Sequence, residues 1–222
     1  LQELGGEEAR KLSRERLHKI LSLSEQQQNE KVFFNLGMLA MDESDSEQAE
    51  LFFKRAIHLK SDFRSALFNL ALLLADANRP LDAVPFLNQL IRHHPTHIKG
   101  LILLGDIYIN HMKDLEAAEQ CYRNILQYDP LNTQGLHNLC VVFVERKHLS
   151  RAQACLRFAH QMFPSEDYIE RHLKIVNERL QKLAKLPDSS PEKQQAFANF
   201  DGREFSLNRS KKSSTTSKMG AT

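Results

Sequence analysis

The sequence has little of what a strand-rich domain or a membrane span requires. Only 8 glycines and 7 prolines occur among 222 residues, there is no tryptophan, and the β-branched runs typical of strands are missing. The longest apolar runs, such as residues 70–75, are far shorter than the roughly 20 residues that cross a bilayer. The composition therefore predicts an all-α chain that makes no membrane contact itself.

Neither the charge nor the cysteine content is extreme. The 30 Lys and Arg residues nearly balance 28 Asp and Glu residues, whereas nucleic-acid binding depends on many basic contacts to phosphates. This balance argues against nucleic acid as the main ligand. Cys121, Cys140 and Cys155 are too few for a disulfide framework. We expect them to act as small apolar core residues.

A repeat of 34 residues organises residues 30–166. Counted from Glu30 as position 1, apolar residues recur at positions 4, 7, 11 and 24, and small residues recur at positions 8 and 20. Small residues at a helix crossing let two antiparallel helices approach closely. Proline follows the second helix of three units, where the helical hydrogen bonds must end. The units predicted are residues 30–63, 64–97, 98–132 and 133–166, the third with one extra residue in its turn.

This pattern resembles the tetratricopeptide family and predicts a right-handed superhelical solenoid of helical hairpins. Residues 1–29 are expected to form a helix from a preceding partial repeat, and residues 167–186 an amphipathic capping helix. Residues 187–222 have too little apolar surface to offset the entropy of ordering. We expect this tail to be disordered.

Binding by stacked hairpins is expected on the concave surface that the first helices line. Position 6 holds asparagine in three units, with Leu103 in the other. Because a carboxamide both donates and accepts, such a ladder can pair with the main chain of an extended peptide. It resembles the asparagine ladder of O-linked N-acetylglucosamine transferase, although asparagine is also a common choice here in these repeats. The predicted peptide-binding groove comprises Asn35, Asn69, Asn138, Lys31, Lys99 and Asp106.

No arrangement of residues predicts catalysis, a cofactor or a metal site. The HExxH, GxSxG, GxGxxG and GxxxxGK[ST] patterns are missing from the sequence. A cluster of three histidines lies at a helix end, at His93, His94 and His97. Partial positive charge on these side chains suits the helix dipole there, which accounts for them better than a metal site does. Cys121 and Cys155 occupy equivalent positions of neighbouring repeats, about 10 Å apart, and are expected to stay unpaired.

A more specific resemblance extends over residues 33–180, including turns and the cap. Segments such as FNLGMLAMDESDSEQAELFFKRAI, QGLHNLCVVFVE and DYIERHLKIVNERL resemble the C-terminal repeats of one family. This is the transmembrane and tetratricopeptide-repeat-containing (TMTC) family of endoplasmic-reticulum protein O-mannosyltransferases. The chain starts at Leu1 without a visible secretory signal, and we interpret it as a fragment of such a longer protein.

The resemblance implies an upstream membrane domain that transfers mannose from dolichyl-phosphate mannose to Ser or Thr of acceptors, chiefly cadherin-type domains. The catalytic residues would lie in that domain, and the repeats would recruit or orient a polypeptide partner in the lumen. The sequon at Asn208 would then be accessible for N-glycosylation. The alternative is a repeat scaffold of a soluble cytosolic complex without transferase activity, which unpaired cysteines would favour.

Overall fold

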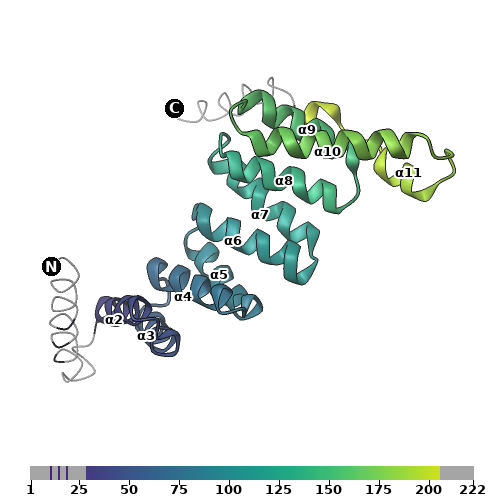
Figure 1. Ribbon diagram of the computed structural model, residues 1–222. Coiled ribbons are helices and arrows are strands. Elements are labelled where there is room, and N and C mark those ends of the chain that lie inside the picture. Colours follow the sequence, from purple (N-terminus) through teal and green to yellow (C-terminus); the bar gives the residue numbers. More distant parts are fainter. Residues whose placement is uncertain (1–10, 12–14, 16–18, 20–28, 206–222) are drawn as a thin grey trace, which may run out of the picture. The chain divides into compact units, whose positions relative to one another are not determined.

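The computed structural model describes residues 29–205 together with Lys11, Glu15 and Lys19 (Figure 1). This described part is helical and contains no strand, which confirms the all-α prediction. Most of the helix expected within residues 1–29, and the tail beyond residue 205, lie outside the described residues. The chain divides into two compact units, Leu1–Met112 and Lys113–Thr222, which are described separately.

The first unit consists of consecutive helical hairpins (Figure 1). Helix α2 packs against α3 and α4 packs against α5, while α3 contacts α4 and α5 contacts α6. Each helix therefore buries its apolar face against its neighbours along the chain. The bounds are α2 Glu30–Asp42, α3 Ser46–Leu59, α4 Arg64–Asp76, α5 Pro80–His93 and α6 Ile98–Ile107, followed by a π-helical segment, η2, at Tyr108–Met112.

The small residues of the repeat do bring the helices close together. A Cβ added to Gly37 on α2 would lie 2.6 Å from Cε1 of Phe53 on α3. Two non-bonded carbon atoms cannot be this close, so one of the helices or side chains would have to move. Phe53 and Ala49 are completely buried in the same hairpin. Glycine at this position is therefore required by close packing, as the repeat pattern predicts.

The turns that follow the first helices share a backbone conformation that the sequence does not signal with glycine. Ser44, Asn78, Lys113 and Lys147 all have φ between 57° and 61°. After Ser44, the Asp45 amide donates to the Ala40 carbonyl at 2.8 Å, which is the hydrogen bond typical of a left-handed helix end. Each of these residues thus ends a first helix without glycine.

The extra residue of the third repeat lies in a helix, and not in the turn where the sequence analysis places it. Helix α6 continues into the π-helical segment Tyr108–Met112. A π-helical turn accommodates one additional residue inside a helix. The insertion is therefore absorbed before the chain reaches the left-handed turn residue Lys113.

In the second unit, α8 and α9 form a hairpin that contacts α7 on one side and α10 on the other (Figure 1). Helix α10 buries Ile169, Val176 and Leu180, and its opposite face is charged. It lies where the sequence predicts a capping helix. The bounds are α7 Leu115–Tyr128, α8 Thr133–Glu145, α9 Leu149–Met162, α10 Asp167–Ala184, α11 Pro191–Ala196 and the 3-10 helix η3 Gly202–Phe205.

The prediction of disorder from residue 187 onward is wrong for residues 187–205. Helix α11 contacts α9 and α10, and η3 contacts α9. Ala196 is buried, the Lys193 ammonium donates to the carbonyls of Ala184 and Leu186, and Glu204 pairs with arginines of α7 and α9. A few specific polar contacts hold this segment in place. The prediction of disorder was based on the small number of apolar residues, which gives no information about such contacts.

The expectation that Cys155 stays unpaired is also wrong. Cys140 on α8 and Cys155 on α9 form a disulfide, with their Cα atoms 5.4 Å apart. Cys121 is the equivalent of Cys155 in the neighbouring repeat, but the partner of Cys155 lies within its own hairpin. Cys140 stands at the close helix crossing of the same hairpin and faces Cys155 directly. Cys121 is buried and lies outside this bond.

Candidate functional site

The predicted groove residues of the first unit lie on first helices, with different exposures. Lys31 and Asn35 are exposed one turn apart on α2, so their side chains share a face. Asn69 on α4 is half-buried, and its Nδ2 donates to the Ser65 carbonyl of its own helix at 2.8 Å. Asn35 therefore offers a more accessible carboxamide than Asn69.

Helix α6 carries Lys99 and Asp106 two turns apart, with Lys99 exposed and Asp106 half-buried. Their spacing of seven residues places them on one face of the helix. This helix begins with a histidine cap: His97 Nδ1 accepts from the Gly100 amide at 3.0 Å, and its ring lies 4.9 Å from that of Phe68. Burial, together with the positive charge of Arg64, lowers the pKa of His97.

The neighbouring histidine has a structural contact as well. His94 Nε2 lies 2.7 Å from the carbonyl oxygen of Asp62. Across the described residues, no group of three or more His, Cys, Asp or Glu side chains is arranged to hold a metal ion.

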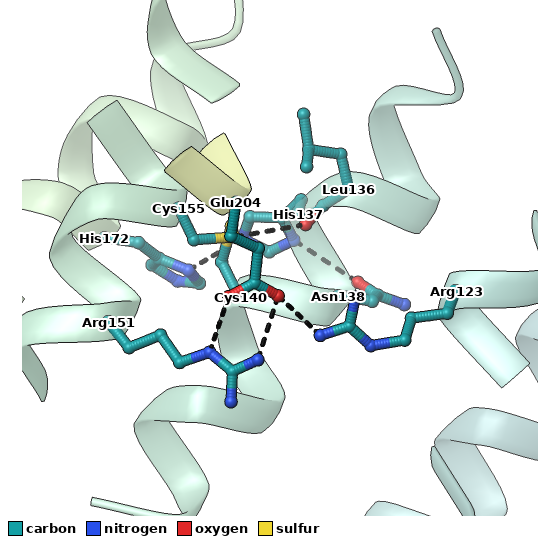
Figure 2. The surroundings of a disulfide bond; sticks show 9 residues. All are labelled: Arg123, Leu136, His137, Asn138, Cys140, Arg151, Cys155, His172 and Glu204. Carbon is teal, nitrogen blue, oxygen red and sulfur yellow. Dashed lines mark hydrogen bonds and ion pairs between the residues drawn. A yellow bond between two sulfur atoms is a disulfide. The ribbon is translucent and has the colours of Figure 1, made fainter. Parts of the chain in front are cut away.

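In the second unit, Asn138 borders a pair of histidines (Figure 2). His137 Nε2 lies 2.8 Å from His172 Nδ1, which joins α8 to α10, and His137 Nδ1 lies 3.3 Å from Asn138 Oδ1. The Tyr168 ring meets the His137 ring edge-on at 4.8 Å. Helix α10 thus covers part of the first-helix face that carries Asn138.

The surroundings of His137 favour its neutral imidazole. Burial lowers the pKa of His137 and so does the charge of His172, and the contact with Asn138 opposes them only in part. A hydrogen bond between two ring nitrogens needs one donor and one acceptor, so the contact is lost if both rings are protonated. His137 occupies position 5 of its repeat, a groove position that the sequence analysis did not single out.

One cysteine of the disulfide, Cys140, lies on the same helix as His137 and Asn138 (Figure 2). Cys140 and Cys155 are both fully buried, and the Cys155 sulfur lies 4.0 Å from the Leu136 carbonyl. A covalent bond between α8 and α9 holds the helix that carries His137 and Asn138. The first-helix face of this hairpin is therefore cross-linked to its second helix.

Two further sequence expectations concern the membrane and glycosylation. Within the part of the chain that the structure describes, no helix combines the length and apolar character needed to cross a bilayer. Asn208 lies outside the described residues, so the sequon stays a prediction.

Protein-family models for the tetratricopeptide repeat match residues 30–63, 65–97 and 98–130. A tetratricopeptide repeat protein from Parabacteroides merdae has a similar structure, with a TM-score of 0.66 at 17% sequence identity over 80% of this chain and 68% of its own. At this identity the likeness concerns the fold alone. The predicted tetratricopeptide fold class is confirmed.

Two curated relatives share far more sequence. Protein O-mannosyl-transferase Tmtc3 of Drosophila melanogaster is 72% identical over 203 residues, which make up 91% of this chain and 22% of the relative. Protein O-mannosyl-transferase TMTC3 of Homo sapiens is 47% identical over 180 residues, 81% of this chain and 20% of the relative. The chain thus spans about one fifth of the length of these relatives. The matched repeats, the fold and the sequence identity together show that this chain is a tetratricopeptide-repeat region of the transmembrane and tetratricopeptide-repeat-containing family.

Proposed function

We propose that this chain is the protein-interaction module of a membrane-bound protein O-mannosyltransferase, and that its repeats recruit or orient the acceptor polypeptide. The 72% identity to a protein named O-mannosyl-transferase carries the proposal. Repeats of this kind offer extended surfaces for binding other polypeptides. Transfer of mannose from dolichyl-phosphate mannose to Ser or Thr, chiefly of cadherin-type domains, would take place in another part of the full-length enzyme.

The first-helix faces support a role in holding extended polypeptide. Asn35 and Lys31 present a carboxamide and an ammonium one turn apart on α2, and Lys99 with Asp106 adds charges of both signs on α6. Carboxamides pair with main-chain groups irrespective of the side chains in the peptide. Such recognition suits an enzyme that must accept several related domains.

The disulfide supports a lumenal location over a cytosolic one. Disulfides persist in oxidising compartments such as the endoplasmic-reticulum lumen and are rare in the cytosol, where thiols are kept reduced. The bond between Cys140 and Cys155 joins two fully buried side chains of one hairpin. It removes the argument that unpaired cysteines favour a soluble cytosolic scaffold, which is the second candidate function.

The recruitment role can be tested in a full-length transferase that carries this chain as its repeat region. The asparagines of the predicted groove are replaced together by alanine, and mannose on a cadherin-type acceptor is measured by mass spectrometry. Mannosylation is expected to fall at least several-fold while thermal melting of the repeats stays nearly unchanged. Unchanged mannosylation would count against the groove. The variant is Asn35→Ala, Asn69→Ala and Asn138→Ala, and the control is Asn88→Ala with Asn199→Ala, two exposed residues outside the first helices.

The compartment is tested by the oxidation state of the hairpin in cells. Free thiols are blocked by acid trapping and alkylation, the protein is reduced, and newly released thiols are labelled with a second reagent. Peptides containing Cys140 and Cys155 should carry the second label. If the first reagent labels both residues instead, their thiols are free in cells, and this result would favour the cytosolic scaffold.

A further inference from the structure

Three arginines gather on the second unit where α7, the end of α8 and α9 meet. Arg123 lies on α7, Arg146 follows α8, and Arg151 lies on α9. They surround Glu119, whose carboxylate is 2.7 Å from Arg123, 3.0 Å from Arg146 and 3.6 Å from Arg151. One carboxylate of the helical body therefore faces three guanidinium groups, which leaves an excess of positive charge.

The C-terminal segment supplies a second carboxylate to this cluster (Figure 2). Arg151 donates through Nε to one oxygen of Glu204 at 3.0 Å and through Nη2 to the other at 2.9 Å, and Arg123 donates to Glu204 as well. Two-point recognition of a carboxylate by arginine fixes its orientation. The Glu204 side chain is only 11% exposed, so it lies in a formed site instead of resting on the surface.

An aromatic contact stands next to the carboxylate contact. The Phe205 ring meets the ring of Phe143 edge-on, with 6.0 Å between centroids, and Phe143 is fully buried. The Arg151 guanidinium lies 4.1 Å from the centroid of the same Phe143 ring. Arg151 thus links the two contacts, because it binds the carboxylate while it packs on the aromatic ring.

The preceding residue, Arg203, is far more exposed than Glu204. The Arg203 side chain is 91% exposed and pairs with the nearby Asp201 of its own segment. Two consecutive residues, a carboxylate and then an aromatic ring, make the contacts with the helical body described above. The element that presents them, η3, has four residues and contacts α9.

We propose that Arg123, Arg151 and Phe143 form a peptide-recognition site for a glutamate followed directly by an aromatic residue, which residues 201–205 occupy in cis. A partner segment with the same two side chains would bind by displacing the chain's own segment. The cationic residues of this Glu-Phe site belong to second helices, whereas the predicted groove residues belong to first helices. The site is thus separate from the function proposed above.

Occupation in cis sets the affinity that a partner must have. A segment tethered to its site by a short linker acts at an effective concentration on the order of millimolar. A free peptide that binds the empty site with a dissociation constant near 10 µM would then appear about a hundred-fold weaker in the intact chain. Release of the tail should accordingly strengthen binding in trans.

The test uses the full 222-residue chain with Glu204→Lys and Phe205→Ala, which empties the site without touching the helical body. The probe is a fluorescent peptide of residues 199–205, and its binding is measured by anisotropy. The peptide should bind the released variant at least ten-fold more tightly than the wild-type chain. Arg203→Ala in the chain is the matched control and should behave like wild type.

Specificity is tested with the same probe. A peptide with Glu204→Gln should bind the released variant at least ten-fold more weakly, and adding Arg151→Glu to the chain should abolish binding. Equal binding to the wild-type and released chains, or indifference to the glutamate, would overturn the proposal. A second readout needs no variant: excess peptide should speed amide hydrogen exchange of residues 201–205 in the wild-type chain, and unchanged exchange at peptide concentrations that saturate the released variant would contradict displacement.

Discussion

Removing the disulfide between α8 and α9 should destabilise the second unit by a measurable amount. The cross-linked residues are 15 positions apart, and restraining a loop of that length in the unfolded chain contributes about 3 kcal/mol in the chain-entropy model. For a chain of this size, 1 kcal/mol shifts the melting temperature by roughly 2 to 4 °C. We therefore expect a decrease of about 6 to 12 °C in the melting step that reports on α8 and α9.

The assay is thermal unfolding followed by circular dichroism, with and without reductant. Wild type should lose stability when reductant is added, and Cys140→Ala with Cys155→Ala should melt near the reduced wild type and be insensitive to reductant. Both cysteines are fully buried, so the alanine variant also loses some packing and can melt slightly lower. The comparison of oxidised with reduced wild type isolates the bond itself.

Cys121→Ala is the control for other effects of reductant. Cys121 lies outside the disulfide, so this variant should keep the full difference between oxidised and reduced protein. Identical melting of wild type in both conditions would refute the reasoning. So would loss of the reductant effect in Cys121→Ala.

Two further predictions concern packing and protonation. Gly37→Ala should cost roughly 1 to 3 kcal/mol of unfolding free energy, because its Cβ would overlap the Phe53 ring. This free energy is measured by chemical denaturation. The control is Gly202→Ala, which should leave the unfolding free energy unchanged because a Cβ there has no atom within 4 Å. Burial and His172 lower the pKa of His137, so the unfolded chain takes up a proton more readily. The unfolding free energy should then be fully retained above the ordinary histidine pKa of about 6.5 and fall as the pH drops below it. His137→Gln should make the unfolding free energy less dependent on pH. An unaltered pH profile would mean that other groups cause the dependence.

The sequence was most informative where the repeat itself determines the packing. Close approach of Gly37 to Phe53 follows from a small residue at position 8 and a large one at position 24. Helix ends before Pro95 and Pro130 follow from the missing amide hydrogen. Such features recur every 34 residues, so one repeat supports the interpretation of the next.

Features that occur once were not predictable in this way. Glu204 binds Arg151 and Arg123, which are 53 and 81 residues distant, and no period relates them. The disulfide was within reach of the sequence, because Cys140 stands at a position known to face the second helix. A comparison of equivalent positions in neighbouring repeats does not reveal it, because Cys140 and Cys155 occupy different positions of one repeat.

The predicted groove is a mixed case. The repeat pattern places Asn35 and Asn69 at equivalent positions of α2 and α4, yet Asn69 donates to its own helix while Asn35 is exposed. Side-chain hydrogen bonds of asparagine to the preceding helical turn depend on local competition. The same position can therefore differ in its capacity to bind peptide from one repeat to the next.

The left-handed turn residues also bear on how the repeats can diverge. Ser44, Asn78, Lys113 and Lys147 share one backbone conformation although their side chains differ in size and charge. A left-handed conformation costs a residue other than glycine about 1 to 2 kcal/mol, and the described part of the chain tolerates this at these four turns. Each repeat thereby keeps a side chain at a site where glycine would be more stable, so its turns can acquire new surface chemistry without altering the path of the backbone.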